Sequence, residues 1–338
     1  MNTIDKKQSL GGFEKYLPLW IPLCMAIGVL LSLYTTLGER IEALAIGGIS
    51  IPIGICLFFM MYPAVLNLKG SELRKLKDNP QPILLTLFSN WIIAPLVGFV
   101  LAKMFLSDHD ELFVAVILLS ASPCTAMVLV WGSMADGNQE QNVVNTSLNT
   151  ITIMIFYAPL VALLTGIQNI EIDRWGLAIS VLVFIGLPIL AGLLTRKIVI
   201  PMKGETWFDE TYRPALGKIS IVSLLTTLIV LFALNGNTIL GSPEYLLLIS
   251  IPLLLGFVIV VGINIAMTKL FRLKYREAAV TVIIGSSSHF EIAIATAIAA
   301  YGVGSVAALG TTMGLFWEIP IMLGLVYLAR YLGRKNFW

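Results

Sequence analysis

The sequence predicts an all-α membrane protein in which ten transmembrane helices form two inverted five-helix repeats. Of the 338 residues, 57% are hydrophobic and only 12% are charged, and the mean hydropathy is +0.89. An average soluble domain has about 25% charged residues, so this composition places nearly the whole chain in a bilayer. Ten apolar runs approach the roughly 20 residues that a helix needs to cross the hydrocarbon core. Two of these runs, the fourth of each half, contain polar or helix-breaking residues, which predicts broken helices in spans four and nine.

Short segments with Asn, Gly, Pro or charged residues separate the ten runs. We place the spans at 17–37, 44–66, 83–102, 112–134, 143–166, 175–195, 219–235, 245–268, 278–300 and 304–329. The seventh run is the shortest, and its start is the hardest to place. Residues 1–166 and 167–338 then each hold five spans of one integral membrane domain. Because five is an odd number, the second repeat must insert upside down relative to the first.

The positive charges predict the orientation of these spans. All but three of the 22 Lys and Arg residues fall on one side, in the segments 1–16, 67–78, 196–218, 269–276 and 330–338. The three on the other side are Arg40, Lys103 and Arg174. The positive-inside rule therefore predicts a multi-pass protein of the cell membrane with both termini in the cytoplasm. The N-terminal segment lacks a signal-peptide cleavage pattern, and the small net charge of +2 argues against nucleic acid as a partner.

The sequence contains none of the common enzyme motifs. We find no paired aspartate cluster, no HExxH, no GxSxG and no P-loop, so the chain is predicted to be neither an enzyme nor an ATP-driven pump. Three widely spaced cysteines give neither a disulfide framework nor a zinc-ligand spacing. No cofactor is predicted.

The fourth span contains the break SPCTAMVLVW at 122–131. Pro123 removes a backbone donor and interrupts the helix, which exposes Cys124 to a cavity beside Ser122 and Thr125. A cysteine in an apolar span is most often a small hydrophobe, and this interpretation suits Cys24 and Cys56. A thiol at a break instead suits a soft, thiol-seeking solute, so Cys124 is the candidate metalloid ligand.

The ninth span contains SSSHFEIAIA at 286–295, with a carboxylate in its middle. A charge near the bilayer centre costs at least about 2.5–3.5 kcal/mol, so Glu291 calls for a functional reason. We predict that Glu291 carries a proton or binds a cation, with Ser288 and His289 beside it; a protonated acid joining two helices is the structural alternative. Glu318, before Pro320 in the tenth span, is a second candidate for proton coupling or a structural carboxyl.

Two asparagines lie in spans three and five. Asn90 occurs in NWIIAP at 90–95 and Asn149 in SLNT at 147–150. Polar amides in membrane helices are commonly hydrogen-bonding groups between helices, worth about 0.6–2 kcal/mol. Lining the solute cavity beside spans four and nine is the other interpretation, and both are kept here.

Several of these segments resemble the arsenical-resistance arsenite efflux permeases, in the superfamily shared with bile-acid:sodium symporters and auxin-type carriers. IPIGICLFFMMYPAV (51–65), NWIIAP and YAPL (157–160) resemble signatures of the second, third and fifth spans. SPCTAMVLVW carries the thiol of the fourth span, SSSHFEIAIA is similar to the ninth, and MGLFWEIPIML (313–323) to the tenth. The resemblance extends over nearly the whole chain.

This resemblance implies that Cys124 and Glu291 are the functional pair of a secondary active exporter. The solute would be arsenite or antimonite, leaving the cytosol in exchange for protons, and a cytosolic arsenic metallochaperone would fit as a partner. Spans three to five and eight to ten would form a core that moves against a panel of the other four. Ser288 and His289 replace the usual Asn-Asn of the family, and Leu315 and Trp317 change the usual Gly-Pro context before Glu318. These departures predict an altered arsenite-to-antimonite preference or a different solute.

Two rival functions stay open at this point. The first is a sodium-coupled organic-anion carrier of the bile-acid type, which needs a cluster of oxygen ligands for sodium near spans four and nine and gives Cys124 no purpose. The second is a membrane sensor without turnover, which has little support because the tails are short and contain no signalling domain.

Overall fold

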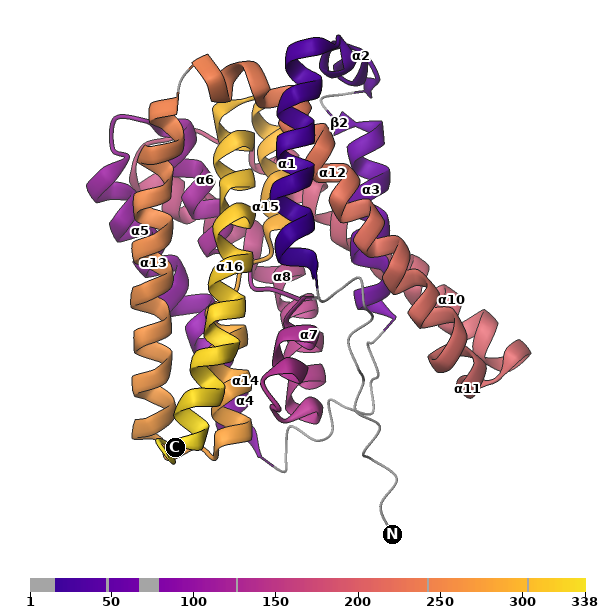
Figure 1. Ribbon diagram of the computed structural model, residues 1–338, viewed down its shortest axis with the longest axis vertical. Helices are drawn as coiled ribbons and strands as arrows, with labels where there is room; N and C mark the ends of the chain where they lie inside the picture. Colours follow the sequence, from indigo (N-terminus) through magenta and orange to yellow (C-terminus); the bar gives the residue numbers. More distant parts are fainter. Residues whose placement is uncertain (1–15, 47–48, 67–78, 126, 242, 303) are drawn as a thin grey trace.

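The computed structural model is almost entirely helical (Figure 1). It describes residues 16–46, 49–66, 79–125, 127–241, 243–302 and 304–338. The predicted N-terminal segment and the cytoplasmic charges at Lys69, Arg74, Lys75 and Lys77 lie outside these residues. Two strands of two residues each, β1 (Ala45–Ile46) and β2 (Ile49–Ser50), pair just before helix α3 (Ile51–Val65). They displace the start of the second apolar helix from the expected residue 44 to Ile51.

Helices occur in all ten predicted ranges. In six of them the helix is long and apolar enough to cross a membrane: Pro80–Phe105, Gln139–Ile167, Arg174–Lys203, Glu205–Gly236, Pro243–Leu270 and Val306–Arg334. The others are α1 (Leu17–Tyr34), α3 (Ile51–Val65), and the broken pairs α6 (Asp110–Ser120) with α7 (Met127–Met134) and α14 (Tyr275–Gly285) with α15 (Phe290–Tyr301). The chain is therefore a multi-pass membrane protein, while ten crossings and two inverted repeats stay predictions.

The sequence suggested that the seventh span is the shortest, but the structure shows a long helix there. Helix α12 extends from Arg213 to Gly241 and continues from α11 (Glu205–Trp207) and η5 (Phe208–Tyr212). We ended the span at its charged residues, but a helix continues past the hydrocarbon core. Charge limits the depth of a segment in lipid and does not limit its helicity.

Three helices contain a turn of π-helix immediately before an X-Pro pair. These turns are η3 (Ser89–Ile93) before α5 (Ala94–Phe105), η4 (Leu182–Gly186) before α10 (Leu187–Lys203), and η5 before α12. Proline cannot donate to the preceding turn, and its ring clashes with the carbonyl four residues earlier. The backbone widens there, so that the N–H of Ala94 donates to the carbonyl of Ser89 five residues back. Asn90 lies inside the first of these widened turns, after α4 (Pro80–Phe88).

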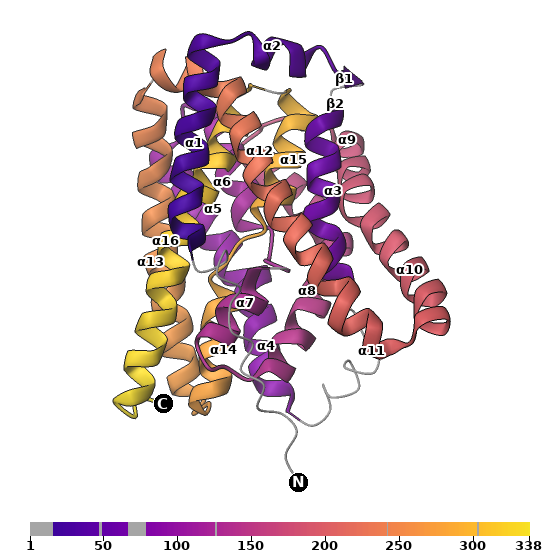
Figure 2. The same ribbon diagram turned by 45° about the vertical axis from the view of Figure 1, so that its right-hand side comes forward.

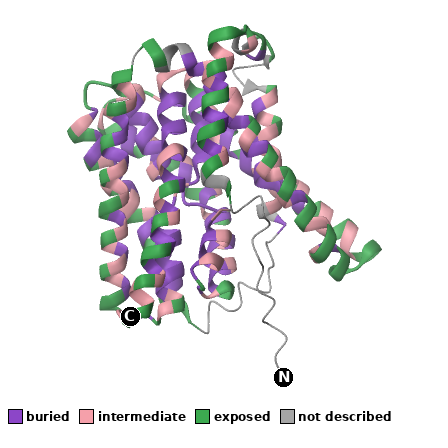
Figure 3. Cartoon of the chain, viewed as in Figure 1, coloured by how far each residue is buried: buried purple, intermediate pink, exposed green. Residues whose placement is uncertain are grey.

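The helices have buried inner faces and apolar outer faces (Figure 3). Exposed outer residues such as Leu96, Leu163 and Val258 are apolar because they face lipid. The fourth and ninth helices cross inside this bundle. In both ribbon views α6 and α15 occupy the upper half and α7 and α14 the lower half, so both breaks lie near mid-height (Figures 1 and 2).

Helices α1 and α12 pack closely at Gly28, where a larger residue would be costly. A Cβ added at Gly28 would lie 2.6 Å from the backbone oxygen of Ile229 and 2.6 Å from Cβ of Phe232. Because a helix backbone cannot move away cheaply, Gly28→Ala should lower stability by about 1–3 kcal/mol. Thermal unfolding of the detergent-purified protein measures this. Gly262→Ala is the control because nothing lies within 4 Å of its added Cβ, and an equal fall in both variants would contradict the explanation.

Candidate functional site

The two helix breaks meet as short antiparallel extended segments. Pro123 pairs with Ser288 in an isolated β-bridge, and the N–H of His289 donates to the carbonyl of Ser122 at 2.6 Å. Helix α6 ends before this pairing because Pro123 has no N–H to donate. The hydroxyl of Ser122 bonds back to the carbonyl of Leu119 at 2.8 Å, which satisfies one of the groups that the helix end leaves open. We call this meeting point the crossing, defined as residues 121–125 and 286–289.

Cys124 is buried at the crossing, and two amides hold its backbone. The residue is only 2% exposed. Nδ2 of Asn149, from α8 (Gln139–Ile167), donates to the carbonyl oxygen of Cys124 at 2.9 Å. Nδ2 of Asn90 in turn donates to Oδ1 of Asn149 at 3.1 Å. The two asparagines are therefore interhelical hydrogen-bonding groups, and they fix the segment that carries the thiol.

Thr125 follows the thiol with an unsatisfied hydroxyl. Its Oγ1 is buried and has no hydrogen-bond partner among the residues that the structure describes. An unpaired buried hydroxyl costs about 1–3 kcal/mol, so such a group is expected to bind water or a ligand. Cys124 and Thr125 are consecutive residues, so this segment of the crossing contains both a buried thiol and an unsatisfied hydroxyl.

The acids predicted from the sequence contact the other segment of the crossing. Glu291 lies in the first turn of α15 and is 6% exposed, and its Oε2 lies 2.8 Å from Nδ1 of His289. Neither ring nitrogen of His289 forms a hydrogen bond of normal geometry within the described residues, so this contact is close but poorly aligned.

Glu318 reaches the crossing from α16 (Val306–Arg334). Its Oε1 accepts a hydrogen bond from the N–H of Ser288 at 3.0 Å, and its Oε2 accepts one from the hydroxyl of the same residue. One carboxyl thus accepts hydrogen bonds from both donors, the N–H and the hydroxyl, of the residue that pairs with Pro123. Five of the nine candidate residues lie in the crossing itself: Ser122, Cys124, Thr125, Ser288 and His289. Asn149 and Glu318 bond directly to it, Glu291 contacts His289, and Asn90 reaches it only through Asn149.

A second polar cluster beside the crossing was not predicted. Nδ2 of Asn264, in α13 (Pro243–Leu270), lies within hydrogen-bonding distance of Oγ of Ser89 at 2.8 Å, the carbonyl of Gly285 at 3.1 Å and Oγ of Ser286 at 3.2 Å. It supports the end of α14 just before the crossing. The only sequence signal was a single Asn in the apolar run VVGINIAM, the same kind of signal that we used for Asn149.

The described residues offer a single soft ligand at the crossing. They contain no group of three His, Cys, Asp or Glu side chains that could hold a metal ion. Cys24 lies in α1 and Cys56 in α3, each outside the broken helices. The crossing therefore combines one thiol with hydroxyl, amide and carboxyl oxygens. This set can bind a small solute with both soft and hydrogen-bonding character.

Removing the Glu318 carboxyl should destabilise the crossing, because the N–H of Ser288 would lose its acceptor. We expect Glu318→Ala to lower stability by about 1–3 kcal/mol. Glu318→Gln keeps one oxygen for that N–H and should retain most of the stability. Thermal unfolding compares the two variants, and transport by the Gln variant at two pH values separates positioning from proton coupling. Equal stability of Glu318→Ala and the unmodified chain would contradict the positioning role.

Comparisons with known proteins agree with this architecture. The Sodium Bile acid symporter family matches residues 54–242. An uncharacterized transporter of Synechocystis sp. is 36% identical, over 100% of this chain and 94% of that protein. The arsenical-resistance protein Acr3 of Corynebacterium glutamicum is 33% identical over 99% of this chain and 93% of its own length. Acr3 of Alkaliphilus metalliredigens is 31% identical over 100% and 97%.

The family match covers more than half of the chain, and the matches to the two Acr3 proteins cover nearly all of it. They identify a membrane transporter and not an enzyme. The chain belongs to the Sodium Bile acid symporter family, in the branch that contains the Acr3 arsenical-resistance proteins.

Proposed function

We propose that this transporter exports trivalent arsenic as arsenite, with antimonite as a second solute, from the cytosol in exchange for protons. The observation that carries the proposal is the position of Cys124, a buried thiol in a helix break whose carbonyl is held by Asn149. Similarity to two arsenical-resistance proteins over nearly their full lengths supports the same solute.

The thiol supplies selectivity for a soft solute. Near neutral pH trivalent arsenic is mainly the uncharged trihydroxide. The Cys124 sulfur displaces one hydroxide, and the thiol proton leaves with that hydroxide as water. The remaining hydroxyl groups of the solute need hydrogen-bond partners, and the unsatisfied hydroxyl of Thr125 offers one. One sulfur ligand binds the solute more weakly than a three-cysteine site would. A transporter needs this weaker binding because it must release its solute.

Glu291 supplies the coupling to protons. An uncharged solute gains nothing from the membrane potential, so uphill export needs a coupled ion. Glu291 lies in the first turn of α15, three residues after Ser288, the residue that pairs with Pro123, and Cys124 directly follows Pro123. A carboxyl that alternates between its protonated and ionised forms at this place can link solute release to proton binding. His289, whose Nδ1 lies 2.8 Å from Oε2 of Glu291, modulates that exchange.

The surrounding architecture fits alternating access. In this proposal 1–166 and 167–338 are inverted repeats, and the crossing joins the fourth helix of one to the fourth helix of the other. The protein lies in the cell membrane with both termini on the cytoplasmic side, as the charge distribution predicts. A cytosolic arsenic metallochaperone would deliver the solute to that side.

A direct experiment separates this proposal from a sodium-coupled organic-anion carrier. The purified chain is reconstituted into liposomes loaded with unlabelled arsenite, and counterflow of labelled arsenite is measured with and without sodium. Sodium-independent counterflow that excess antimonite inhibits is expected. Sodium-dependent uptake of a bile acid without arsenite counterflow would overturn the proposal, and absence of turnover for both solutes would favour the sensor.

A further inference from the structure

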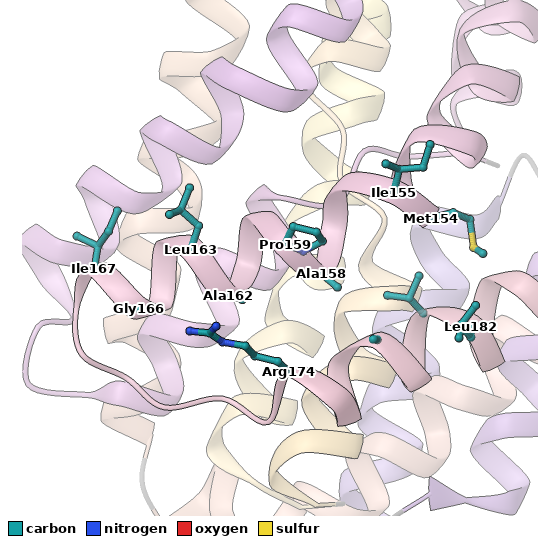
Figure 4. Close-up of a pocket in the computed structure, with 12 residues that line it drawn as sticks. Met154, Ile155, Ala158, Pro159, Ala162, Leu163, Gly166, Ile167, Arg174 and Leu182 are labelled. Atoms are coloured by element: carbon teal, nitrogen blue, oxygen red, sulfur yellow. The ribbon is translucent and has the colours of Figure 1, made fainter.

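A large groove lies away from the crossing, between the second half of α8 and the helix formed by α9 (Arg174–Val181) and η4 (Figure 4). We call it the α8–α9 groove. Its volume is about 930 Å³, at the upper end of the roughly 300–1,000 Å³ of ordinary ligand pockets. It shares no lining residue with the crossing, so the transported solute does not explain it.

Small side chains on α8 create this groove. Ala158, Ala162 and Gly166 repeat every four residues and therefore lie on one face of the helix. A Cβ added at Gly166 would meet no atom within 4 Å, so the space beside it is open. Ala178 and Val181 of α9 line the opposite wall. The helices are held apart here, and their own side chains do not fill the gap.

The rim of the groove is apolar and exposed. Ile155 is 57% exposed, Leu163 61%, Ile167 54% and Leu182 58%. All four occur in helices that are long and apolar enough to cross a membrane. In a bilayer this rim faces lipid tails, so a flexible apolar chain is an occupant that the groove can accept without desolvating polar groups.

Arg174 gives one end of the groove a positive charge. It is the one charged residue among those that line the groove, and Figure 4 shows its side chain extending from the start of α9 towards the Ala162–Gly166 turn of α8. It forms no ion pair with a carboxylate in the described part of the chain, and Asp173 beside it caps α9 through the N–H of Trp175. Trp175 is 80% exposed, as expected of a tryptophan at the level of the lipid head groups.

We propose that the α8–α9 groove binds one acyl chain of an anionic phospholipid whose phosphate is held by Arg174. A guanidinium binds phosphate oxygens through two parallel hydrogen bonds, and the apolar groove below it accommodates the chain. Because α8 and α9 are consecutive helices joined at the boundary of the two proposed repeats, the lipid fastens one repeat to the other. The inference does not depend on which solute the crossing carries.

Native mass spectrometry of the full-length protein in detergent tests the site, with phosphatidylglycerol and phosphatidylcholine added in turn. Arg174→Ala should lower phosphatidylglycerol retention roughly tenfold, to the level of phosphatidylcholine. In Gly166→Leu the new side chain enters the open space of the groove without a clash, so this variant should retain less of both lipids. Lys103→Ala is the matched control, because Lys103 is exposed and is one of the other cations predicted on the same side.

Clear outcomes decide against the site. Equal retention by Arg174→Ala, Gly166→Leu and the unmodified chain would overturn it. A dimer that dissociates in Gly166→Leu, without a change in bound lipid, would assign the groove to a second copy of the chain instead. If Gly166→Leu does not fold, Ala162→Leu replaces it, and Arg174→Ala alone still tests the head-group contact.

Discussion

Replacing Cys124 by Ser is expected to reduce arsenite export at least 100-fold. The substitution changes one atom at a residue that is 2% exposed, so the fold should be retained. An alcohol oxygen is a hard ligand that trivalent arsenic binds far more weakly than sulfur. The hydrogen bond from Asn149 goes to the Cys124 backbone and is unaffected. Efflux from arsenite-loaded cells that lack their own exporter measures the effect.

Cys24→Ser is the matched control for this prediction. Cys24 is also buried, at 7% exposure, but lies in α1 among apolar neighbours of the hydrophobic core. We expect Cys24→Ser to retain export, with at most a modest loss of stability. If Cys124→Ser exports arsenite as fast as Cys24→Ser and the unmodified chain, the thiol is not the ligand.

Replacing Glu291 by Gln is expected to abolish pH-driven export while arsenite still binds. Glutamine has the same shape but cannot release a proton, so the coupling step is removed and the thiol stays. In everted vesicles an acidic lumen corresponds to an acidic cell exterior. The unmodified chain should accumulate arsenite at least tenfold better with this gradient than without it, and Glu291→Gln should show no difference. Arsenite counterflow at equal pH is the measure of retained binding.

Glu277→Gln controls for loss of a carboxylate elsewhere in the same broken helix. Glu277 lies in the first turn of α14, where it accepts a hydrogen bond from Asn79 at 2.8 Å. This variant should keep the response to the pH gradient. Uphill export by Glu291→Gln equal to that of the unmodified chain would remove the coupling role from Glu291.

The sequence indicated the broken helices because their causes are local. Pro123 removes a backbone donor, and the serines before His289 compete with the helix for backbone hydrogen bonds, so both signals can be read from neighbouring residues alone. Interhelical hydrogen bonding by Asn90 and Asn149 was one of two interpretations that we kept open, because an amide in a membrane helix needs a partner but the sequence does not say which. The structure supplies that partner, and it adds the carbonyl of Cys124.

Contacts between residues distant in sequence were not predictable from one chain. Glu318 bonds Ser288 across 30 residues, and Asn264 reaches Ser89 across 175. No periodicity links such positions, because they are set by how whole helices pack. The length of α12 was also missed, since its first residues are charged and were assigned to a loop. The π-turns before Pro95 and Pro188 follow from proline sterics and were overlooked.

In the proposed function, a thiol and a carboxyl at the crossing exchange arsenite for protons. Everted vesicles that contain the chain test it most directly, through labelled arsenite accumulation after the lumen is made acidic. We expect accumulation that collapses when a protonophore removes the gradient and that is absent with Cys124→Ser. Accumulation that persists in Cys124→Ser, or that requires sodium and ignores the pH gradient, would contradict it.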